Sequence, residues 1–94
     1  MPKVLILQAA RDDLARLEDF LEEKNLDAAC RMKDVILKSL RILEKSPNLG
    51  SQFGRFKRLI IRFGKSKYVI IYNYLPADDT VYVISMRHSR EFSG

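Results

Sequence analysis

Residues 68–88, with the sequence YVIIYNYLPADDTVYVISMRH, contain two runs that are rich in β-branched and aromatic side chains. The runs cover residues 68–74 and 80–88, and the turn-forming sequence LPADD separates them. A third run of this kind, residues 58–63, comes before them and is joined to them by GKSK. Three consecutive strands with short connections predict an antiparallel meander in the second half of the chain.

The first half of the chain has helical rather than strand periodicity. Leu14, Leu17 and Leu21 recur at the spacing of one helix face. We expect Asp12 and Asp13 to lie in the first turn of this helix, where the helix dipole favours negative charge. The sequence EEKNLD then interrupts the pattern, so the first helix ends there.

A second helix is predicted directly after this interruption. Asp27 is expected to cap it by accepting a backbone N–H, and Pro47 follows its end. Its apolar positions are Ala28, Met32, Val35, Ile36, Leu40 and Leu43. Because only a few residues separate the two helices, we predict that they form an antiparallel hairpin.

A short apolar run at residues 3–7 is predicted to be a further strand before the helices. The element order is therefore β-α-α-β-β-β. The predicted fold class is α+β, an antiparallel sheet with the helical hairpin packed on one face. The length suits a single domain covering residues 1–94.

Alternation along the strands predicts two different sheet faces. A two-residue turn at residues 65–66 would pair Arg62 with Val69 and Ile60 with Ile71. The face expected under the helices carries Leu59, Ile61, Phe63, Tyr68, Ile70 and Tyr72. The opposite face carries Arg58, Ile60, Arg62, Val69, Ile71 and Asn73.

This second face is partly apolar although it is predicted to face away from the helices. Exposed apolar patches often mark binding surfaces. We therefore predict that a protein partner contacts Ile60, Val69 and Ile71. The alternative is that residues 48–56, NLGSQFGRF, fold over the same side chains.

The composition restricts the chemistry and the compartment. Cys30 is the only cysteine, so the chain cannot form an internal disulfide or a cysteine-based zinc site. We predict no metal and no cofactor, and a single thiol fits the reducing cytoplasm. The apolar stretch near the N-terminus is too short for a signal peptide, and nothing approaches the length of a membrane span.

The net charge of +5 is placed unevenly along the chain. Residues 1–46 hold nine basic and nine acidic side chains, whereas residues 47–94 hold eight basic and three acidic ones. Six cations and no acid lie between Arg55 and Lys67. This asymmetry indicates an anionic partner, either nucleic acid or an acidic protein segment; the alternative is a solvated basic surface.

The remaining candidates for chemistry are Arg58, Arg62, Arg87, His88 and Arg90. Arginines can hold a phosphate bidentately, and a histidine can act as an acid or a base, which are the groups that RNA cleavage through the 2′-hydroxyl needs. Neighbours in a strand point to opposite faces, so at most one of Arg87 and His88 joins Arg62 on the outer face. The alternative is a half-buried histidine at a strand end with no catalytic role.

Three segments together resemble the RelE/ParE superfamily of bacterial type II toxins, over nearly the whole chain. Residues 9–50 are similar to its helical hairpin, YVIIY to its central strand, and ISMRHSRE to its last strand, where His88 and Arg90 match a recurrent ending. The long hairpin is more similar to ParE-like members, whereas Arg62 matches a basic position of RelE-like nucleases. Such nucleases often have a basic residue where Val69 stands and a late tyrosine where Phe92 stands.

The resemblance implies a plasmid-stabilisation type of toxin that a cognate antitoxin, encoded beside it, neutralises, and it allows a heterotetramer of the two. The expected target is DNA gyrase, and the alternative is ribosome-dependent cleavage of mRNA. Whether the protein is an enzyme depends on this choice. The expected catalytic residues, if it is a ribonuclease, are His88, Arg87 and Arg90. The expected target- or nucleic-acid-binding residues are Lys57, Arg58 and Arg62, and the expected antitoxin contacts are Ile60, Val69 and Ile71.

Overall fold

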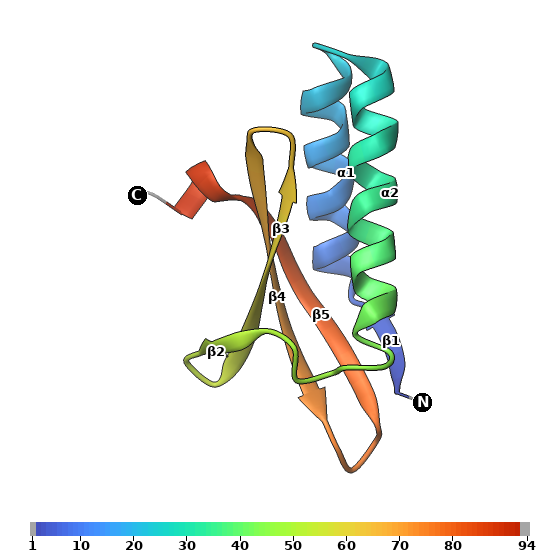
Figure 1. Cartoon of the computed structure of the whole chain (residues 1–94), viewed down its shortest axis with the longest axis vertical. Coiled ribbons are helices and arrows are strands. Elements are labelled where there is room, and N and C mark those ends of the chain that lie inside the picture. Colours follow the sequence, from blue (N-terminus) through green and yellow to red (C-terminus); the bar gives the residue numbers. More distant parts are fainter. Residues whose placement is uncertain (1, 93–94) are drawn as a thin grey trace.

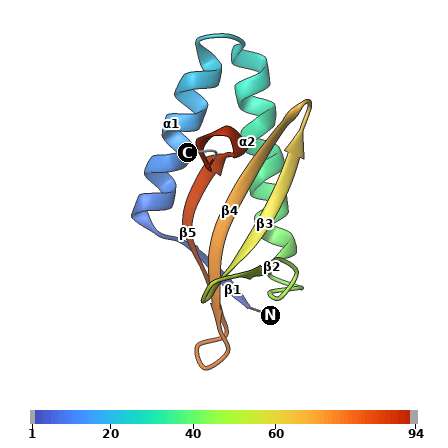
Figure 2. The same cartoon turned by 90° about the vertical axis from the view of Figure 1, so that its left-hand side faces the viewer.

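The structure, a computed structural model, describes residues 2–92 and contains one mixed sheet with two helices against one face (Figures 1 and 2). The elements are β1 (Lys3–Ile6), α1 (Gln8–Glu22), α2 (Leu26–Ile42), β2 (Ser51–Phe53), β3 (Phe56–Phe63), β4 (Ser66–Leu75), β5 (Thr80–His88) and the 3₁₀ turn η1 (Ser89–Phe92). The strand order is β1-β5-β4-β3-β2. The predicted α+β architecture is confirmed.

Two details of the sheet differ from the prediction of an entirely antiparallel sheet. β1 pairs with β5 in parallel, with Val4 opposite Val81, because the helical hairpin carries the chain back before the meander begins. β2 is an additional strand in the segment that was expected to be a loop. It folds back onto β3 through a turn at Gly54, which has a φ of +62°. The three residues of β2 are all exposed, so the sequence shows no alternation of apolar and polar residues that would predict a strand there.

The positions predicted for the acidic residues at the two helix starts are wrong. α1 begins at Gln8, so Asp12 and Asp13 lie in its second turn rather than its first. α2 is capped by Asn25, whose side chain accepts the backbone N–H of Ala28 at 3.0 Å. Asp27 lies inside the first turn and pairs with Arg31 at 3.0 Å. Asn25 has the extended backbone that a capping residue needs, and the sequence does not distinguish it from Asp27.

The core lies between the helical hairpin and the sheet. Its fully buried side chains include Met32 and Ile36 from α2 and Ile70, Tyr72, Val81, Val83 and Met86 from β4 and β5. These positions follow the helix and strand periodicities of the sequence. Most of the apolar positions predicted to pack between the helices and the sheet do so, but Leu21, Val35, Leu59 and Phe63 are only partly buried. In the first turn of α2 the buried residue is Ala29 rather than the predicted Ala28.

The turn between β3 and β4 is one residue earlier than predicted. It consists of Gly64 and Lys65, with a φ of +59° at Gly64, a region that favours glycine. Ile60 therefore pairs with Val69 rather than with Ile71. The predicted turn and the observed turn both contain two residues. The residue opposite each position of β3 therefore shifts by two along β4, and the side chains keep their predicted faces.

A close contact at Gly50 anchors the loop after α2 to the sheet. Its N–H donates to the hydroxyl of Tyr72 at 2.8 Å. A Cβ at position 50 would lie 2.7 Å from the carbonyl oxygen of Arg58 and 2.9 Å from the Tyr72 ring. Burial raises the pKa of Tyr72, so its hydroxyl stays protonated at neutral pH while it accepts this bond.

Gly50→Ala is expected to lower the free energy of unfolding by about 1–3 kcal/mol, the usual cost of forcing extra volume into packed structure. The neighbouring Ser51→Ala is the control, because Ser51 is exposed. Urea unfolding of both variants measures the difference. Equal stabilities for the two variants would show that the loop adapts without cost.

Candidate functional site

The outer face of the sheet, the side away from the helices, carries cations around an apolar strip. Three cross-strand rows lie on it: Arg62 with Lys67; Ile60 with Val69 and Arg87; and Arg58 with Ile71 and Ser85. The sheet therefore brings Arg58, Arg62 and Arg87 onto one face. His88 is the strand neighbour of Arg87 and belongs to the other face, as alternation predicts.

The predicted apolar patch on this face is much smaller than expected. Ile60 is 48% exposed, but Val69 and Ile71 are only 6% exposed each. The prediction that Val69 and Ile71 lie open to a partner is therefore wrong. Burial on both faces of a central strand depends on the elements that fold over it, and here Phe53 and η1 lie against this side.

A concavity of about 470 Å³ opens on the outer face around Arg58. It is lined by Phe53, Arg58, Ile60, Val69 and Ser89. The guanidinium of Arg58 stacks on the ring of Phe53 at 5.2 Å, and its buried Nε has no hydrogen-bond partner among the described residues. An arginine held beneath an aromatic ring at the wall of an open concavity can bind an anionic group.

Arg87 is tied to the helices rather than free on the surface. Its Nη1 donates to Oδ1 of Asp13 at 3.0 Å, and Oδ2 of Asp13 accepts the backbone N–H of Met86 at 3.0 Å. Arg16 lies 3.7 Å from the same carboxylate and pairs with Glu91 at 2.7 Å. No local pattern in the sequence indicates these roles of Asp13 and Glu91, because their partners are far away in the chain or in an irregular segment.

His88 lies against the core side of the sheet. Its ring meets the ring of Tyr68 edge-on, with centroids 5.3 Å apart, and its Nδ1 accepts the backbone N–H of Arg90 at 3.2 Å. The backbone N–H of His88 donates to Glu91 at 2.8 Å. Burial raises the pKa of Tyr68, so this phenol is not a base at neutral pH. The surroundings of His88 hold the ring in place and do not aim it at the outer-face arginines.

Two further candidate site residues are Lys57 and Arg90. Lys57 lies opposite Tyr72, whose side chain is buried in the core, so Lys57 belongs to a different face from Arg58 and Arg62. Arg90 is exposed on η1. The side chain of Phe92, the position that the family resemblance singled out, lies outside the part of the chain that the structure describes.

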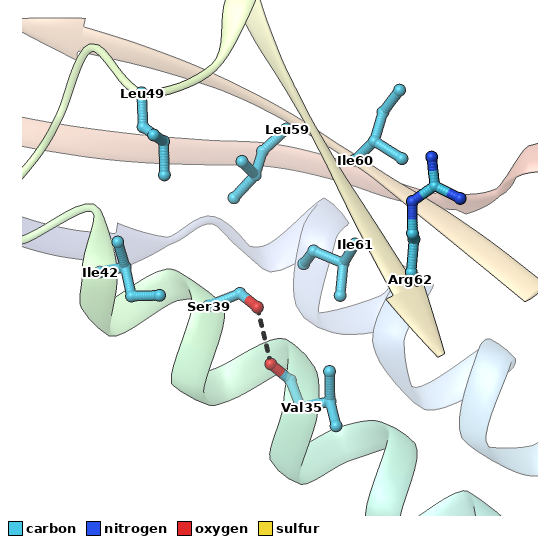
Figure 3. A pocket seen from close by; sticks show the side chains of 8 residues that line it. All are labelled: Val35, Ser39, Ile42, Leu49, Leu59, Ile60, Ile61 and Arg62. Carbon is cyan, nitrogen blue, oxygen red and sulfur yellow. Dashed lines mark hydrogen bonds between the residues drawn. The ribbon is translucent and has the colours of Figure 1, made fainter. Parts of the chain in front are cut away.

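A groove of about 310 Å³ lies between α2 and β3 (Figure 3). Its lining residues are Val35, Ser39, Ile42, Leu49, Leu59, Ile60, Ile61 and Arg62. Ile42, Leu49 and Ile60 are exposed although they are large and apolar. β4 pairs along one edge of β3, whereas β2 pairs on the other edge only with the first three residues of β3. No described strand therefore pairs with residues 59–63 on that other edge. An apolar groove beside an open strand edge is a typical binding surface for a protein segment.

Residues 2–92 contain no group of three or more histidine, cysteine, aspartate or glutamate side chains that could hold a metal ion. Neither described helix combines the length and the apolar character that crossing a bilayer requires.

Comparison with known proteins identifies the family. Residues 4–91 match the family model described as the ParE toxin of the type II toxin–antitoxin system parDE. The chain belongs to this toxin family, within the RelE/ParE superfamily. It is also 33% identical to Toxin RelE3 of Caulobacter vibrioides over 92 residues, which covers 97% of this chain and 98% of the relative. The protein is thus a toxin of a type II system, and the family implies a cognate antitoxin as its partner.

Proposed function

We propose that this ParE-family toxin inhibits growth by poisoning DNA gyrase. The observation that carries the proposal is the separation of His88 from the arginines of the outer face. Cleavage of RNA through the 2′-hydroxyl needs a base, an acid and positive charge around one phosphate. Here the only histidine is on the core side, and Arg87 is neutralised by Asp13. A gyrase target places the protein in the cytoplasm, which its single thiol also favours.

The second candidate is ribosome-dependent cleavage of mRNA, in which His88, Arg87 and Arg90 would act. Two observations favour it: the concavity beside Arg58 can hold an anionic group, and the curated relative is named Toxin RelE3. In this case Arg58 and Arg62 would hold the RNA. His88 would have to leave the ring of Tyr68 to reach the same phosphate.

The cognate antitoxin is proposed to bind at the groove between α2 and β3. An amphipathic segment of the antitoxin would cover the exposed side chains of Ile42, Leu49 and Ile60, and would shield the open edge of β3. This site keeps Ile60 as an antitoxin contact. Val69 and Ile71 would then support the strand beneath it rather than touch the partner.

Induction of the wild type and of His88→Gln in separate cultures tests the proposal. We expect both proteins to arrest growth and to cause gyrase-linked DNA breaks, because no proton transfer by His88 is involved. Loss of a general acid or base costs a nuclease about 10²–10⁴-fold in rate. The readouts are trapped gyrase–DNA complexes and mapping of mRNA ends on translating ribosomes, with antitoxin co-expression as the control. Codon-linked cleavage by the wild type that disappears in His88→Gln would contradict the gyrase proposal and support the nuclease.

A further inference from the structure

The hairpin of β3 and β4 extends beyond the rest of the sheet at one end. The last residue of β5 in register with β4 is His88, which lies opposite Tyr68. The pairing of β3 with β4 continues past this point to Phe63 and Ser66. Residues 62–67 therefore form a two-stranded tip with no third strand beside it among the described strands (Figure 2).

This tip carries three exposed cations and no acid. Arg62 lies directly opposite Lys67 on the outer face, and Lys65 is in the turn. Like charges directly opposite each other destabilise a strand pair, so this arrangement costs the fold stability. Within residues 2–92, none of the three takes part in a salt bridge, whereas Arg16, Arg31, Lys33 and Arg87 each have an acid within 4.0 Å.

We propose that this tip binds the sugar–phosphate backbone of duplex DNA. The major groove of B-form DNA is wide enough for a two-stranded β-ribbon, and cations on both strands and in the turn can meet phosphates on its two sides. An acidic protein segment fits less well, because the buried centre of a protein–protein interface is usually apolar. The one large apolar side chain here, Phe63, is partly buried against the core and lies 5.9 Å from Arg31 of α2. The choice of DNA over RNA rests on the proposed action on gyrase.

The test measures binding of the full-length toxin, separated from its antitoxin, to a labelled short duplex DNA over a range of salt concentrations. The hairpin variant is Arg62→Gln/Lys65→Gln/Lys67→Gln. The matched control is Lys38→Gln/Arg41→Gln/Lys45→Gln, which removes one arginine and two lysines that are also exposed. Lys38 and Arg41 lie near the end of α2 and Lys45 just after it. This end of α2 is far from the turn between β3 and β4 (Figure 1).

Each lost phosphate contact reduces the slope of log affinity against log salt by about one. We therefore expect the hairpin variant to lower the slope by about three, and the control to leave it near the wild-type value. An equal reduction of the slope in both variants would show an effect of net charge alone and would contradict binding at the hairpin tip. No salt-dependent binding by the wild type, or tighter binding of a single-stranded RNA of equal length, would overturn the assignment to duplex DNA.

The gyrase assay separates this inference from the proposed function. A wild-type toxin that leaves gyrase unaffected contradicts the proposed function, whatever its binding to DNA. A wild-type toxin that traps gyrase on DNA, combined with a hairpin variant that binds DNA as the wild type does, contradicts the hairpin site alone.

Discussion

Asp13→Ala is expected to lower the free energy of unfolding by about 2–4 kcal/mol, because it removes the acceptor of two hydrogen bonds at a sheet edge. β1 ends at Ile6, opposite Val83, so none of the described strands lies on that side of the later part of β5. Asp13 replaces the missing strand by accepting the N–H of Met86, and its side chain is only 14% exposed. The ion pair with Arg87 contributes less, since Arg87 is 40% exposed and water screens the charges.

Asp12→Ala is the matched control. Asp12 is exposed, and its one hydrogen-bond partner among residues 2–92 is the side chain of Gln8, at 2.9 Å, so its loss is expected to change stability by within about 0.5 kcal/mol. Urea unfolding measures both variants, and Arg87→Ala shows how much of the effect is the ion pair. If Asp13→Ala unfolds at the same urea concentration as Asp12→Ala, the carboxylate does not support the edge of β5.

The role of Asp13 illustrates which structural features could be predicted from the sequence and which could not. Periodicities of two and of about 3.6 residues are local, so the helices and the three long strands could be predicted. The bonds from Asp13 reach residues 73 and 74 positions away, and no local pattern specifies such a pairing. For the same reason the parallel pairing of β1 with β5 could not be read from the five residues predicted there.

The sequence predicted on which face of the sheet each candidate site residue lies, but not how exposed its side chain is. Alternation alone placed Arg87 and His88 on opposite sides, and the structure confirms this. Exposure depends on which distant segment covers a side chain. Val69 is buried although it faces outward, and it shares a concavity with Phe53 and with Ser89 of η1, whereas Ile60 is exposed beside the groove between α2 and β3. The groove depends on the distance between α2 and the edge of β3, and a pattern along the sequence does not contain that distance.

Ile60→Asp is expected to weaken antitoxin binding by about 30-fold or more, as loss of an apolar contact that binding buries costs roughly 2–4 kcal/mol at an interface hot spot. Ile60 is 48% exposed at the rim of the groove, next to the open edge of β3. Burying a carboxylate there under an apolar antitoxin segment adds a desolvation cost. Cells that carry this variant should remain growth-arrested at an antitoxin level that rescues the wild type.

The control for this prediction is Leu26→Asp. Leu26 is the first residue of α2, is 61% exposed and does not line the groove, so the same change there should leave binding to the antitoxin unaltered. The partner is the protein encoded by the adjacent open reading frame, and the measurement is calorimetry on the purified pair. Ile60→Thr, which keeps a β-branched side chain, guards against misfolding and should give an intermediate loss. If Ile60→Asp folds and binds as tightly as Leu26→Asp does, the antitoxin covers another surface, and the apolar side chains of the groove need a different explanation.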